Sequence, residues 1–248
     1  MKKTIVTLFA LAGVAAASSS TADLGNGITG TWTEYNFGDA TTTGTNSLTL
    51  PSSWGGPTSW ITLDKAVSLT KEQKLTFSYT YEYASNNGIY GISFLGAVGE
   101  SAFMIGNSDY GNRDLAAAVT TLGSSGFYQD KAQAIRFNPG NSKDRIQAVA
   151  ADDTQVNLGT VTSGAVKAEI AYDETAGAFV MTLSTGAVSK KLELGDSVAF
   201  DTISFAADAD ATQSFTGLNM KIETVPEPAT ATLSLLALAG LAVRRRRK

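Results

Sequence analysis

The 248 residues contain neither histidine nor cysteine. Their absence removes Ser-His-Asp triads, Cys-His pairs, imidazole zinc sites and disulfides. Any catalysis would therefore depend on carboxylates, lysine, tyrosine or serine, and the fold must be stabilised by burial and by sheet hydrogen bonds.

Paired carboxylates are the first candidates for chemistry. A retaining glycosidase needs two of them about 5 to 5.5 Å apart, and acidic residues that alternate along one strand can supply such a pair. Residues 169–174 read EIAYDE, in which Asp173 and Glu174 fit a polar hairpin turn better than a catalytic pair. A carboxylate-dependent glycoside hydrolase is the lesser alternative.

Two acidic segments could offer oxygen ligands to Ca²⁺, which takes six to eight of them. They are Asp152-Asp153 and Asp208-Ala209-Asp210. Neither has the spacing of an EF-hand loop, so acidic surface loops are the favoured interpretation. Calcium stays possible, but no metal ligands and no cofactor are predicted.

Aromatic residues suggest a second kind of site. Trp54 stands in a Gly-Pro loop, where its indole could stack on a sugar ring, and Tyr79, Tyr81 and Tyr83 recur on one face of a strand. The alternative is that these rings fill a sandwich core. Glycan contact through Trp54 and the three tyrosines is thus a hypothesis for the body of the chain.

A glycine motif near the start carries less weight. Residues 25–30 (GNGITG) match the GxGxxG pattern of dinucleotide sites. Such a site needs a preceding strand and a following helix, and this sequence predicts neither here. We interpret the glycines as a turn.

The N-terminal segment has the order of a secretory signal peptide over residues 1–22. Two lysines precede an apolar run over residues 5–14, and Ala15-Ala16-Ala17 supplies the small residues that signal peptidase requires. Cleavage is predicted after Ala17 or, at a second small-x-small site, after Ala22. The apolar run is short for a membrane anchor.

The C-terminal segment, residues 225–248, combines three features in a fixed order. Val225, Pro226, Glu227 and Pro228 precede an apolar stretch at 229–243, and Arg244, Arg245, Arg246, Arg247 and Lys248 follow. The prolines exclude helix through 226–228, and the 15 apolar residues predict a helix about 22 Å long. It would span a membrane marginally, with its basic end in the cytoplasm.

This arrangement closely resembles the PEP-CTERM sorting signal. The resemblance implies cleavage near Pro226 to Pro228 by an exosortase in the inner membrane, followed by transfer to the cell envelope, outer surface or extracellular matrix. The partners it implies are exosortase, signal peptidase and, after transfer, envelope polysaccharide. A plain tail anchor is the alternative.

Residues 23–224 read as one domain of short strands. Residues 75–83 alternate strictly between apolar and polar positions, and the same criterion predicts a hairpin formed by residues 166–172 and 179–184. Further strands are predicted at 30–37, 47–50, 59–63, 88–95, 102–105, 134–137, 145–150, 155–158, 188–194, 202–206 and 215–223. One helix is predicted, at 115–122.

Many short strands separated by Gly, Asn, Asp and Ser predict an all-β, antiparallel β-sandwich. The runs at 47–50, 75–83, 91–96, 170–183 and 215–218 are similar to those of concanavalin-like jelly rolls, such as lectin and glucanase domains. The resemblance implies a jelly-roll fold.

The body holds 12 basic and 22 acidic residues, a net charge of −10, because the other basic residues lie in the two terminal segments. Such a surface repels nucleic acid. The sequence therefore predicts an exported, non-catalytic surface, structural or adhesion module, with glycan binding as the main alternative.

Overall fold

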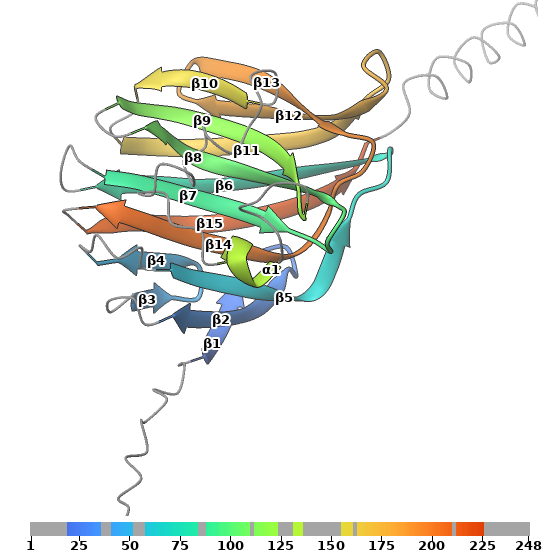
Figure 1. The fold of residues 1–248 in the computed structure, drawn as a ribbon. Coiled ribbons are helices and arrows are strands. Elements are labelled where there is room, and N and C mark those ends of the chain that lie inside the picture. Colours follow the sequence, from blue (N-terminus) through green and yellow to red (C-terminus); the bar gives the residue numbers. More distant parts are fainter. Residues whose placement is uncertain are drawn as a thin grey trace, which may run out of the picture.

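The structure is a computed structural model that describes residues 19–35, 41–51, 58–83, 88–109, 112–123, 131–135, 155–160, 163–209 and 212–225. Within these ranges, two antiparallel sheets lie face to face, as Figure 1 shows. The predicted all-β, antiparallel β-sandwich is confirmed.

The first sheet has eight strands, in the order β1 (Ser19–Asp23), β2 (Thr29–Tyr35), β5 (Thr58–Ser68), β14 (Ala199–Ala209), β7 (Gly88–Leu95), β8 (Ser101–Asp109), β9 (Asn112–Thr121) and β10 (Gln155–Thr160). The second has seven, in the order β13 (Val188–Gly195), β12 (Ala178–Thr185), β11 (Ser163–Asp173), β6 (Gln73–Tyr83), β15 (Gln213–Thr224), β4 (Ser47–Leu50) and β3 (Thr41–Gly44). Strands distant in sequence are neighbours in both sheets.

The core lies between the sheets because one face of each strand is apolar. On β6, Leu75, Phe77, Tyr79 and Tyr81 are buried, while the residues between them point outward. Phe77 meets Phe94 of the facing sheet edge-on, with ring centroids 5.1 Å apart. The strict alternation of residues 75–83 therefore marks a core strand.

A second apolar cluster covers the outer face of the eight-stranded sheet. It joins Met104, Ala116 and Ala118 to Ala134 of the short helix α1 (Lys131–Ile135). The Ser204 hydroxyl donates a hydrogen bond of 2.7 Å to the carbonyl of Ile135 and so fastens α1 to β14. Both faces of β9 are consequently buried.

Two predictions in this region are wrong, and the burial of β9 explains the first of them. Residues 115–122, predicted as a helix, lie almost entirely in β9, because an alanine-rich run can occupy a strand whose two faces both need small side chains. The strand predicted at 134–137 begins inside α1. The strand predicted at 145–150 lies outside the described residues.

The predicted hairpin is present as β11 and β12. The two strands pair from Val166↔Thr185 to Asp173↔Ala178. At the turn, Asp173 Oδ1 accepts hydrogen bonds from the backbone N–H groups of Thr175 and Ala176, at 2.9 and 3.2 Å. Asp173 thus has the turn role that its position predicted.

The glycine motif at 25–30 forms the turn between β1 and β2. Gly25, Asn26 and Gly27 have φ values of 79°, 54° and 76°, a left-handed run that glycine and asparagine tolerate. The N–H of Gly25 donates to Asp23 Oδ1 at 2.8 Å. Because antiparallel strands flank this motif and no helix follows it, it lacks the geometry of a dinucleotide site.

Candidate functional site

Two of the four aromatic residues proposed for glycan contact lie in the core. Tyr79 and Tyr81 are each 2% exposed. The Tyr79 hydroxyl is 3.0 Å from that of Tyr90, and the Tyr81 hydroxyl donates to Gln213 Oε1 at 3.1 Å. This placement matches the core-packing alternative and corrects the proposal of a tyrosine strip on a sheet face. Trp54 and the side chain of Tyr83 lie outside the described part of the chain.

The outer face of the seven-stranded sheet is polar instead. Its cross-strand rows place Lys221, Thr76, Glu169, Thr182 and Lys191 side by side from β15 to β13. Thr76, Glu169 and Thr182 point outward because each occupies the strand position between two core residues, and Lys221 and Lys191 are themselves exposed. The row is therefore a continuous set of hydrogen-bond donors and acceptors.

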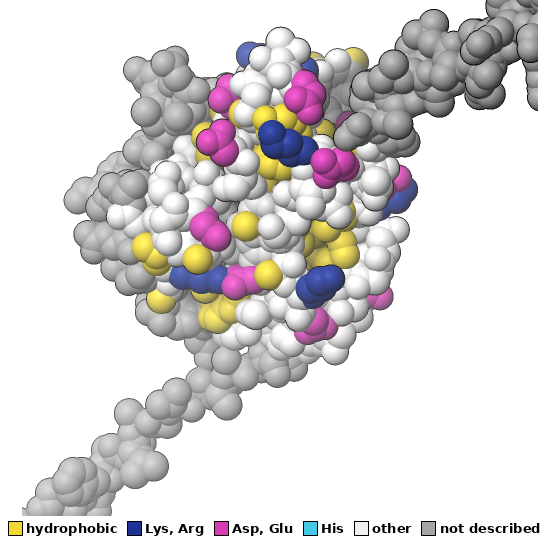
Figure 2. Space-filling model, turned by 90° about the vertical axis from the view of Figure 1, so that its right-hand side faces the viewer, with side chains coloured by type: hydrophobic (Ala, Val, Ile, Leu, Met, Phe, Trp, Pro, Cys, Tyr) yellow, Lys and Arg dark blue, Asp and Glu magenta, His cyan; other side chains and the backbone are white. Residues whose placement is uncertain are grey.

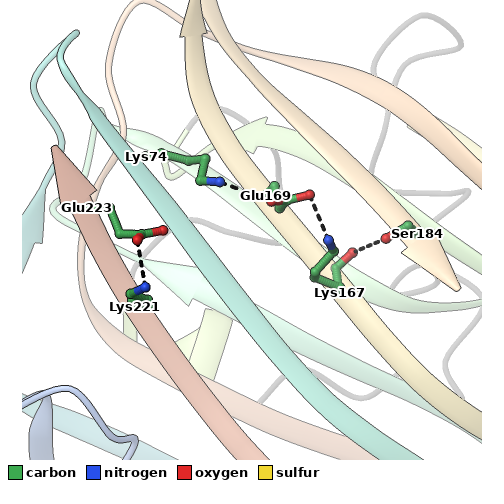
Figure 3. A network of polar contacts seen from close by, with 6 residues as sticks. All are labelled: Lys74, Lys167, Glu169, Ser184, Lys221 and Glu223. Carbon is green, nitrogen blue, oxygen red and sulfur yellow. Dashed lines mark hydrogen bonds and ion pairs between the residues drawn. The ribbon is translucent and has the colours of Figure 1, made fainter. Parts of the chain in front are cut away.

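Ion pairs organise the middle of this face, as Figure 3 shows. Glu169 of β11 lies 3.2 Å from Lys74 Nζ of β6 and 2.9 Å from Lys167 Nζ of its own strand. Lys221 and Glu223 of β15 form a separate pair at 2.6 Å. Glu169 thus links two neighbouring strands.

A shallow depression of about 460 Å³ opens beside Glu169, toward the end of β11. Its lining includes Lys74, Tyr172, Asp173 and Lys191. At the rim, Lys71 Nζ donates to the Tyr172 hydroxyl at 2.9 Å and lies 4.1 Å from the ring centroid. This depression is the candidate functional site.

The lining of the depression carries both signs of charge, with Lys74 and Lys191 beside Glu169, Asp173 and Glu174. Figure 2, which looks onto the right-hand end of the sandwich in Figure 1, shows acidic and basic side chains interspersed, with scattered hydrophobic ones between them. Such a surface suits neutral, hydroxyl-rich ligands better than polyanions, which require concentrated lysine and arginine.

The carboxylates of the site are held ionised. The hydrogen bond from Lys167, with a smaller contribution from that of Lys74, lowers the pKa of Glu169 below its ordinary 4.5 against the opposing effect of burial. The N–H groups of Ala176 and Thr175 lower the pKa of Asp173 below 3.8. A general acid needs the opposite shift, so these groups are suited to accept hydrogen bonds and not to donate a proton.

The lowered pKa of Glu169 predicts a dependence of stability on pH. Because the folded pKa lies below the unfolded one, the stabilisation is complete above about pH 4.5 and is lost as the pH falls through the folded value. Urea midpoints measured between pH 7 and pH 3 should fall at the acidic end, and Glu169→Gln should make the fall shallower. A Glu169→Gln curve as steep as that of the wild type would contradict the assignment.

The two acidic segments considered for Ca²⁺ are not covered by the described side chains. Asp152, Asp153, Asp210 and the side chain of Asp208 fall outside the described residues. Among the side chains that the structure describes, no cluster of three or more acidic residues could hold a metal ion. Within the same part of the chain, no helix is long and apolar enough to cross a membrane; the predicted segment 229–243 lies beyond it.

Comparison with known families identifies the C-terminal segment. Residues 224–248 match the PEP-CTERM protein-sorting motif. The chain is therefore a β-sandwich protein that carries a PEP-CTERM sorting motif, and the motif implies export, processing by exosortase and membrane-anchored transit to the cell surface. No curated protein gives a significant match.

Solved structures similar to the chain are lectin-like sandwiches and some enzymes. The potassium-bound carbohydrate recognition domain of Emp46p is 12% identical, with a TM-score of 0.47, over 79% of this chain and 89% of that one. A legume lectin-like domain from Entamoeba histolytica is 8% identical, with a TM-score of 0.48, over 84% of this chain and 90% of that one. An alginate lyase from Alteromonas sp. 272 is 12% identical, with a TM-score of 0.38, over 78% of this chain and 94% of that one. At these identities the similarity concerns the fold alone.

Proposed function

We propose that the chain is an exported protein that exosortase cuts near Pro226 to Pro228, leaving the β-sandwich as a non-catalytic module of the envelope or extracellular matrix. One observation carries the proposal: the sorting motif at 224–248 begins where the last strand, β15, ends. Thr224 still pairs with Gln73, and the N–H of Val225 donates to the carbonyl of Glu72 at 2.6 Å. A cut after Val225 would therefore leave every described strand whole.

Intact mass of the protein recovered from the envelope and medium of its native host tests this proposal. The expected product ends near Pro226 to Pro228, with or without added glycan mass. A product that retains Arg244 to Lys248 would instead mean that the C-terminal segment is only an anchor.

For the body, we propose binding of neutral glycans at the depression beside Glu169. Support comes from its fixed donors and acceptors, since the ammonium of Lys74 and the carboxylate of Glu169 are already oriented by their pairing at 3.2 Å. Preorganised polar groups reduce the ordering cost of binding sugar hydroxyls.

A glycan array with the mature protein tests this second proposal. Binding should occur without release of reducing sugar, and it should fall about tenfold in Glu169→Gln but not in Lys65→Gln, which changes a lysine outside the depression. Binding that is equal in both variants would exclude the depression. Release of reducing sugar that one Asp or Glu substitution abolishes would favour the hydrolase.

A further inference from the structure

Strand β1 bears on the choice between the two predicted signal-cleavage sites. It pairs with β2 from Ser19↔Thr33 to Asp23↔Thr29, at the edge of the eight-stranded sheet. The second site, after Ala22, lies inside this strand, whereas the first, after Ala17, precedes it. From this overlap we infer that signal peptidase cuts after Ala17 and that β1 belongs to the mature protein, an inference that rests on the proposed export.

The alternation of exposed and buried positions shows that β1 is part of the core. Thr21 and Asp23 are exposed, while Ala22 and Leu24 are fully buried in the main cluster. The backbone N–H of Asp23 also donates to the carbonyl of Thr45 at 2.9 Å. Thr45 lies in the turn between β3 and β4, so β1 joins the edges of the two sheets.

A cut after Ala22 would remove four of the five residues of β1. The new, charged amino group would stand at Asp23, next to the buried Leu24, and β2 would lose its hydrogen-bonding partner along one side. An unpaired edge of this kind invites association with other chains. A cut after Ala17 leaves β1 whole, and Ala15-Ala16-Ala17 matches the A-x-A pattern that signal peptidase requires.

N-terminal sequencing of the full chain exported by its host tests the inference. The expected first residue is Ser18. A sequence that begins at Asp23 would overturn the inference while leaving export intact. A sequence that begins at Met1 would overturn the inference and would also show that no signal peptide is removed. The mass of the C-terminal end tests exosortase processing separately.

Two matched variants test the same point without disturbing the described core. Ala15→Leu and Ser20→Leu each place a large side chain three residues before the cut of one candidate site, and Ser20 is exposed on β1. We expect Ala15→Leu to accumulate as precursor, with loss of most of the processed product. Ser20→Leu should give the wild-type amount beginning at Ser18. The reverse pattern would assign the cut to Ala22.

Discussion

Replacing Pro226, Glu227 and Pro228 together with alanine is expected to abolish C-terminal processing. Proline at two positions keeps the segment before the apolar stretch out of a helix, and alanine is the strongest helix former. The triple variant would extend the helix predicted for residues 229–243 toward β15 and remove the motif that the protease reads. Its intact mass should therefore include Arg244 to Lys248, and the protein should remain in the membrane fraction.

Glu223→Gln is the matched control for the sorting experiment. Glu223 lies on β15 just before the motif, pairs with Lys221 on the outer sheet face and contributes nothing to the core. This variant should be processed like the wild type. Normal processing of the triple variant as well would remove exosortase from the proposal and leave an ordinary tail anchor.

Trp32→Ala is expected to cause the largest loss of stability. Trp32 is fully buried on β2, its ring centroid lies 5.4 Å from that of Phe205, and its Nε1–H donates to the carbonyl of Thr45 at 3.3 Å. Truncating a buried tryptophan costs about 3–5 kcal/mol, because the cavity that it leaves is only partly refilled. Thermal unfolding followed by circular dichroism should show a Tm roughly 10 °C lower.

Trp32→Phe separates packing from hydrogen bonding. The phenyl ring keeps most of the contact with Phe205 but cannot donate to Thr45, so this variant should lose only about 1 kcal/mol. If Trp32→Ala were as stable as Trp32→Phe, neighbouring side chains between β2 and β3 would have to fill the cavity that the indole leaves. The complete burial of Trp32 argues against such filling.

Local patterns predicted most of the strands, including β7, β8 and β14, whose two faces are both buried, but they failed at the alanine-rich residues 115–122. The alternation of residues 75–83 gave β6 with its burial pattern. Residues 115–122 offered no such contrast, because Leu115 and Ala117 face the main core while Ala116 and Ala118 face the cluster under α1. Only the second apolar layer, which a local pattern does not reveal, makes this segment a strand.

The candidate site could not be predicted from local patterns either, because it depends on which strands are neighbours in the sheet. Lys74 and Glu169 stand 95 residues apart in sequence and meet because β6 and β11 are neighbours in the sheet. The spacing of Lys167 and Glu169 on one strand was a visible signal, since residues two apart point to the same face. The tyrosines of β6 were equally visible, but their pattern could not tell which face of the strand is covered by the other sheet.

The position of β15 determines when the domain can fold during secretion. It is the last strand among the described residues, yet it lies between β6 and β4 inside its sheet, and β14 likewise lies between β5 and β7. Contacts between such distant segments form slowly, because long loops must close first. The sandwich therefore cannot be completed from its amino end as the chain emerges from the translocation channel; it closes only after Thr224 has emerged, ahead of the sorting segment.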